Sequence, residues 1–183
     1  MKNIYLHTHM GLGDAIILNS LIRDVCSKND SVVLFCLDVY YKSIKWMFRD
    51  IKNLSYQQIP FINAETEVAR FISSNNLNDN IVRLGFRDIE PLCKNGIPFY
   101  DSFYLAYNYD VNFRFENFYY ERNIEYENYV YNTLNPKNEK YIFIIDDSEH
   151  HLGNFKISDD MISSKYKIIR YDKKINYNDE RFL

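Results

Sequence analysis

Apolar stretches of two kinds alternate along the N-terminal part of the chain. Four short runs have the length of β-strands: residues 4–6, 31–37, 53–56 and 80–84. The three segments between them carry apolar side chains at the 3.6-residue spacing of amphipathic helices: residues 15–25, 39–48 and 65–74. Because parallel strands need helical crossovers, this order predicts an α/β fold, a Rossmann-like parallel sheet with flanking helices. We expect the first, second and fourth runs to be neighbouring parallel strands.

Aromatic residues dominate the next part of the chain, from residue 99 to residue 131. Tyr100, Phe103, Tyr104 and Tyr107 have the i, i+3, i+4, i+7 spacing that predicts a helix. Acidic residues are interspersed among the rings, and two interpretations stand. Ring faces with neighbouring carboxylates suit sugar recognition. The interpretation we favour is that the rings form the core of helices packed over the sheet.

A second unit is expected near the C-terminal end of the sequence. The Asn-Pro-Lys-Asn segment at residues 135–138 is typical of a turn or linker. Beyond it, apolar runs at residues 141–145 and 167–170 predict two more strands. We therefore expect an N-terminal Rossmann-like domain at residues 1–135, which ends in the helical aromatic-rich segment, and an incomplete second α/β unit at residues 140–183.

Composition and charge exclude several classes of protein. The chain has 183 residues and a formal net charge of −3, with no run of Lys or Arg, which argues against nucleic-acid binding. It contains no apolar stretch long enough to span a membrane, and its first residues do not resemble a signal peptide. Cys26, Cys36 and Cys93 are too few and too scattered for a disulfide framework. The expectation is a cytoplasmic protein without a transmembrane segment, with peripheral membrane contact left open.

The loop that follows the first predicted strand carries the most informative motif. Gly11 and Gly13 allow positive φ and a close approach of the backbone to a ligand, and the helix that follows offers free N–H groups. A dinucleotide-binding fingerprint requires a third glycine where Ile16 stands, and the Gly-Lys-Ser/Thr of a P-loop is absent. Asp14 has two interpretations, a helix-capping carboxylate or a functional acid at the ligand edge of the sheet.

Four histidines and one isolated arginine complete the candidate chemistry. His7 and His9 on an extended segment point to the same side, so a metal is conceivable, but we favour substrate hydrogen bonding and expect neither a metal nor a cofactor. The acidic and histidine-rich cluster at residues 146–151 is interpreted as a solvated loop. Arg122 lies among acids and is expected either to pair with Glu125 or to hold an acceptor phosphate or carboxylate.

The sequence Gly-Leu-Gly-Asp-Ala-Ile-Ile-Leu-Asn-Ser-Leu-Ile-Arg, residues 11–23, resembles the opening of GT-B glycosyltransferases of the lipopolysaccharide heptosyltransferase type. The resemblance covers about the first 25 residues and, more loosely, the α/β layout that follows. It implies an acceptor-side domain in which Asp14 is the candidate base for the acceptor hydroxyl. It also implies a complete C-terminal Rossmann domain for the nucleotide sugar, whereas only about 44 residues run from Lys140 onward. A mostly absent donor half is therefore expected, supplied by a partner or missing from a truncated chain.

Two functions of different classes follow. The leading hypothesis is transfer of a sugar from a nucleotide-sugar donor to a hydroxyl of a carbohydrate acceptor, with Asp14 as the base and with His7, His9, Gly11, Gly13 and Arg122 as substrate contacts. The alternative is a non-catalytic nucleotide- or sugar-binding module. A dinucleotide-dependent oxidoreductase is disfavoured by Ile16.

Overall fold

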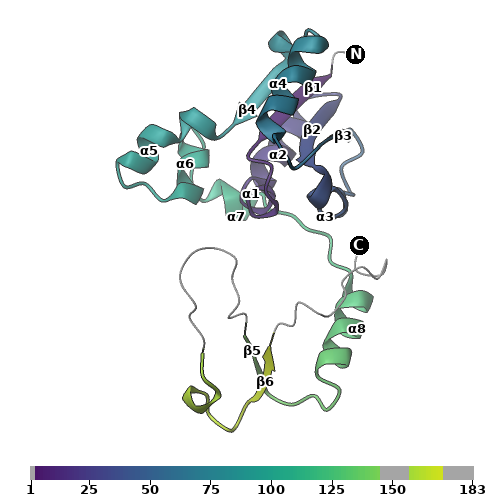
Figure 1. Ribbon diagram of the computed structural model, residues 1–183, viewed down its shortest axis with the longest axis vertical. Coiled ribbons are helices and arrows are strands. Elements are labelled where there is room, and N and C mark those ends of the chain that lie inside the picture. The colour runs from purple at the N-terminus through teal and green to yellow at the C-terminus, as the bar shows by residue number, and fades with distance from the viewer. Residues whose placement is uncertain (1–2, 145–156, 171–183) are drawn as a thin grey trace. The chain divides into compact units, whose positions relative to one another are not determined.

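The computed structural model describes residues 3–144 and 157–170. The chain forms two compact units that divide between Glu121 and Arg122 (Figure 1). This division places helix α8 (Ile124–Leu134) with the second unit, whereas the sequence-based boundary near residue 135 assigns it to the first. Each unit is described separately below.

A four-stranded parallel sheet forms the centre of the first unit. Its strands are β1 (Ile4–Thr8), β2 (Val32–Leu37), β3 (Leu54–Ile59) and β4 (Ile81–Leu84), in the order β3-β2-β1-β4. Leu6 in β1 lies opposite Leu34 in β2 and Val82 in β4. All three strand pairs are parallel, so the expected Rossmann-like α/β fold and its neighbouring strands are confirmed.

Two apolar clusters contact alternate side chains of the strands. Leu34 and Cys36 of β2 pack with α1 (Leu12–Ile17), α2 (Asn19–Ser27) and α3 (Tyr41–Met47). Phe35 and Leu37 of the same strand pack with α4 (Ala64–Ser74). Since successive side chains of a strand point to opposite faces, the sheet has helices on both sides. Three 3₁₀ turns complete the connections: η1 (Asp38–Tyr40), η2 (Asn78–Asn80) and η3 (Phe86–Asp88).

The single helix expected at residues 15–25 is divided in two at Leu18. Its φ of −85° and ψ of 3° separate α1 from α2. The buried Tyr104 donates a hydrogen bond from its hydroxyl to the carbonyl oxygen of Ile17, at 2.6 Å. A side chain that bonds a carbonyl of the helical ladder is a recognised cause of such a break. The residue responsible lies far along the chain, and helical periodicity alone cannot reveal it.

The aromatic-rich segment contains both buried and exposed rings. After β4 the chain forms α5 (Glu90–Lys94), α6 (Phe99–Leu105) and the short α7 (Phe113–Glu116) (Figure 1). Phe103 and Tyr104 of α6 are fully buried, as expected for a helix over the core. Phe115 and Phe118, in contrast, are 67% and 45% exposed. Core packing therefore accounts for Phe103 and Tyr104 but not for Phe115 and Phe118.

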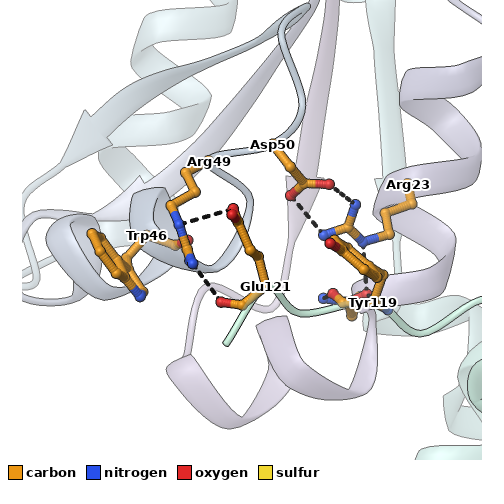
Figure 2. Close-up of polar contacts among 7 residues, drawn as sticks. Arg23, Trp46, Arg49, Asp50, Tyr119 and Glu121 are labelled. Carbon is orange, nitrogen blue, oxygen red and sulfur yellow. Dashed lines mark hydrogen bonds and ion pairs between the residues drawn. The ribbon is translucent and has the colours of Figure 1, made fainter. Parts of the chain in front are cut away.

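The extended segment after α7 is fastened to α2 (Figure 2). The side-chain amide of the buried Asn19 donates to the carbonyl oxygen of Tyr119 at 3.1 Å, and its oxygen accepts from the Tyr119 amide at 3.2 Å. The guanidinium of Arg23 lies 5.0 Å from the centre of the Tyr119 ring and donates twice to Asp50, at 2.7 and 3.0 Å. These contacts fix the backbone of the segment at Tyr119.

Arg49 holds the last residue of the first unit. Its guanidinium Nε lies 3.2 Å from a carboxylate oxygen of Glu121, and the same group also donates to the Glu121 carbonyl (Figure 2). The guanidinium stacks over the ring of Trp46, 4.0 Å from its centre. The chain thus leaves the first unit from a defined position on α3 and the turn after it.

The second unit contains α8 and a two-stranded sheet. Strands β5 (Tyr141–Ile144) and β6 (Lys167–Arg170) are parallel, with Tyr141 opposite Lys167, and the 3₁₀ turn η4 (Asp159–Met161) precedes β6. The side chain of Asn123 caps α8 by accepting a hydrogen bond from the Tyr126 amide at 3.0 Å. Helix α8 and the parallel strand pair confirm the expected start of a second α/β unit. No helix in the described part of the chain is long and apolar enough to cross a membrane.

Candidate functional site

The order of the strands identifies one edge of the sheet as the place for a ligand. The chain passes from β1 to β2 and β3 in one direction and then returns to place β4 on the other side of β1. The carboxyl ends of β1 and β4 therefore flank a topological switch point, where open α/β sheets bind ligands. His7, His9, Gly11, Gly13 and Asp14 all lie in β1 or in the turn and helix that follow it.

Asp14 lies in the first turn of α1 and is half-buried. The helix begins after Gly11, which has no side chain to cap it, and the Gly11 amide donates to the Asp14 carboxylate. This is the half of a capping box in which the third helical residue reaches back to the first free amide. A Cβ on Gly11 would lie 2.6 Å from Asp14 Oδ2, so glycine permits the close approach. The capping interpretation therefore has a definite geometry.

The electrostatic surroundings of Asp14 also suit a proton acceptor. Burial raises the pKa of its carboxyl group, while His9 and the Gly11 amide oppose the rise. A carboxylate with a raised pKa is a stronger base than one in bulk water. Capping and proton transfer are compatible here, because the Gly11 bond occupies only part of the carboxylate's accepting capacity.

His7 is buried at the end of β1, with 4% of its surface exposed. Its Nε2 lies 3.4 Å from a carboxylate oxygen of Glu65 in α4. Burial, with Arg83 and His9 as further causes, lowers the pKa of His7 to about 4, and burial raises the pKa of Glu65. His7 is thus neutral near pH 7, and its contact with Glu65 is a polar contact rather than an ion pair.

His9 lies beyond the end of β1 and packs in a different environment. Its ring contacts those of Phe99 and Phe103 in α6, with centres 5.9 and 5.4 Å apart. His7 instead meets Phe35 on the α4 side, at 5.8 Å. The alternation expected for an extended segment ends with the strand at Thr8, so the two histidines do not form the same-side pair that the spacing indicates.

The glycine with a positive φ at the switch point is not in the motif. Gly11 has an extended conformation, with φ of −72°, and a Cβ on Gly13 would meet nothing within 4 Å. Gly85, directly after β4, has φ of +104°, and a Cβ there would lie 2.6 Å from Phe103 and 2.7 Å from His9. Sequence reasoning missed Gly85. Its signal is a glycine at the carboxyl end of a predicted strand.

A pocket of about 450 Å³ opens at the switch point. The polar and glycine residues that line it come from β1, β4, α4 and the turn after β4: His7, Glu65, Arg83, Gly85, Arg87 and Asp88. Val68, Ala69 and Ile72 of α4 form its apolar wall. Of these, the sequence identified His7 alone as a candidate, because the others depend on where β4 joins the sheet.

A second pocket of about 500 Å³ lies beside α1. Its lining is mainly apolar and aromatic: Ile16, Ile17, Tyr100, Arg114, Phe115 and Phe118. The Arg114 guanidinium is 4.5 and 4.4 Å from the ring centres of Tyr100 and Phe115, and it pairs with Asp101 at 2.5 Å. These exposed rings with a neighbouring carboxylate have the composition expected for contact with a sugar.

Arg122 belongs to the second unit. Its exposed guanidinium pairs with Glu127, through its Nε at 3.0 Å from both carboxylate oxygens, and not with the expected Glu125. The ion pair raises the pKa of Arg122 and lowers that of Glu127. Any anion that binds Arg122 must compete with this carboxylate.

Within residues 3–144 and 157–170, no three His, Cys, Asp or Glu side chains converge to hold a metal ion. The acidic and histidine-rich cluster at residues 146–151 lies outside the described residues. Comparisons of the chain with models of known protein families, with curated proteins and with solved structures gave no match.

Proposed function

We propose that the first unit is the acceptor-side domain of a GT-B-like glycosyltransferase, with Asp14 as the catalytic base. The observation that carries the proposal is the half-buried Asp14 carboxylate, with its raised pKa, after the first strand of a parallel α/β sheet. The Gly-Leu-Gly-Asp motif that resembles these enzymes begins α1. The aromatic pocket beside Ile16 and Ile17 of the same helix supports a sugar as the acceptor.

In this mechanism Asp14 accepts the proton of an acceptor hydroxyl as the hydroxyl oxygen attacks the anomeric carbon of the nucleotide sugar. The bond from that carbon to the diphosphate breaks at the same time. Backbone amides neutralise the charge of the departing diphosphate. We assign the donor to a part of the enzyme outside the first unit, because the first unit supplies the acceptor side.

The test is Asp14→Asn in the full chain, with transfer from radiolabelled nucleotide sugars to carbohydrate acceptors as the measurement. The asparagine oxygen still accepts the Gly11 hydrogen bond, so unfolding stability should change by less than about 1 kcal/mol. Transfer should slow by roughly 10²–10⁴-fold, because an amide cannot take the proton. Asp79→Asn is the matched control, since Asp79 is exposed in η2 before β4. Transfer at the normal rate by Asp14→Asn would exclude Asp14 as the base.

The alternative function, a non-catalytic binding module, is favoured by one observation. The switch-point pocket is lined by two arginines and two carboxylates, and Asp14 is not among its lining residues. Two results would support this alternative. The wild-type chain would bind a nucleotide or sugar in this pocket without transferring a sugar, and the Asp14→Asn variant would bind the same ligand with the same affinity.

A further inference from the structure

The strand pairing places a charged side chain at the edge of an apolar cluster. Arg83 of β4 lies opposite His7 of β1 and lines the pocket together with α4. On the same face, Phe35 of β2 and Ile59 of β3 are buried in the apolar cluster under α4. Arg83 is exposed at the edge of that cluster and lines the pocket.

The two arginines of the pocket differ from the other arginines of the described chain. Six of those pair with carboxylates: Arg23, Arg49, Arg70, Arg114, Arg122 and Arg170. Within residues 3–144 and 157–170, Arg83 and Arg87 have no carboxylate oxygen within 4.0 Å. Both line the same pocket, Arg83 from the end of β4 and Arg87 from the 3₁₀ turn that follows.

We propose that this pocket binds the phosphate group of a small phosphorylated molecule through Arg83 and Arg87. Guanidinium groups present paired N–H donors that match phosphate oxygens. Gly85 lies between the two arginines and lines the same pocket, so the two arginines are close neighbours along the chain at the end of β4. The pocket volume of about 450 Å³ is in the range of small-molecule sites.

The carboxylates of the pocket indicate what the phosphate is attached to. Glu65 and Asp88 line the same cavity, and each presents oxygens that accept hydrogen bonds. Hydroxyl groups are suitable donors to them, so a hydroxylated phosphate ester fits the full lining better than free phosphate. A different explanation is available for Arg83, because charged side chains on an edge strand prevent it from pairing with strands of other chains. It does not explain why Arg87, outside the strand, lines the same cavity.

The test is an NMR titration of the ¹⁵N-labelled full chain with inorganic phosphate, glucose 6-phosphate and glucose. We expect saturable shifts of the Gly85 amide and the Arg83 and Arg87 Nε–H signals with both phosphates, and none with glucose. Arg83→Gln and Arg87→Gln should each weaken binding by roughly 10- to 100-fold, the value of a charge-assisted hydrogen bond. Arg70→Gln is the matched control, because Arg70 lies on α4, pairs with Glu67 and does not line the pocket.

The outcomes distinguish a phosphate ester from free phosphate as the ligand, and they test the phosphate proposal independently of the catalytic one. Tighter binding of glucose 6-phosphate, lost in Glu65→Gln, identifies a hydroxylated ester, whereas equal affinities identify free phosphate as the ligand. No saturable shift with either phosphate overturns the proposal, and so does an equal loss of affinity in Arg70→Gln. Asp14→Asn should bind normally, so failure of the catalytic proposal leaves this one standing, and failure here leaves Asp14 as the base.

Discussion

Replacing Gly85 by alanine tests the packing that shapes the switch point. Its φ of +104° and ψ of −141° lie in a region that side-chain-bearing residues avoid, at a cost of about 1–3 kcal/mol. The new Cβ would also lie 2.6 Å from Cε1 of Phe103, which is fully buried, and 2.7 Å from Cδ2 of His9. Overpacking of this kind costs a further 1–3 kcal/mol or so. We expect a total loss of about 2–6 kcal/mol of unfolding free energy.

Gly96→Ala is the matched control. Gly96 also has a positive φ, +84°, but a Cβ there would meet nothing within 4 Å. Only the backbone cost of about 1–2 kcal/mol should remain. The assay is urea unfolding followed by the fluorescence of Trp46, the single tryptophan, which lies in α3 of the first unit. Equal losses in the two variants would refute the close packing of Phe103 and His9 against Gly85.

Two further predictions concern His7 and Asn19. Because the folded pKa of His7, about 4, lies below the ordinary 6.5, its contribution to stability is present above pH 6.5 and is lost as the pH falls towards 4. Between pH 6.5 and pH 4, the unfolding free energy of the wild-type chain should fall by about 3 kcal/mol more than that of His7→Gln, as measured by urea unfolding. Parallel pH profiles of the two proteins would contradict this. Asn19→Ala removes both bonds to the Tyr119 backbone and should cost about 2–4 kcal/mol while exposing residues 117–121 to protease. The single-bond variant Asn29→Ala is its control, and unchanged proteolysis would count against the role of Asn19.

Local patterns in the sequence were sufficient to predict the sheet. Strands β1, β2 and β4 coincide with predicted apolar runs because burial selects apolar residues, whereas the edge strand β3 continues past its predicted run through Gln57 and Gln58. The break at Leu18 was not predictable in this way, since its cause is the hydroxyl of Tyr104 in another helix. Similarly, the exposed rings of Phe115 and Phe118 share the spacing of the buried ones, because spacing does not report what covers a helix.

Only part of the candidate site could be predicted from the sequence. Asp14 was identifiable because a Gly-Asp turn after a strand is local, and the structure adds only its bond to Gly11 and its raised pKa. Arg83, Arg87 and Glu65 were not identifiable, because their convergence depends on how β4, the turn after it and α4 come together in space. Apolar periodicity indicates strands and helices but carries no information on which polar side chains meet.

His9 connects the two parts of the site. A positive charge on His9 lowers the pKa of Asp14 and of Glu65, so its field reaches both the proposed base and the proposed phosphate pocket. The rings of Phe99 and Phe103 hold it, and Gly85 leaves room for it. One imidazole therefore lies close enough to act electrostatically on the proposed base and on a carboxylate of the proposed phosphate pocket.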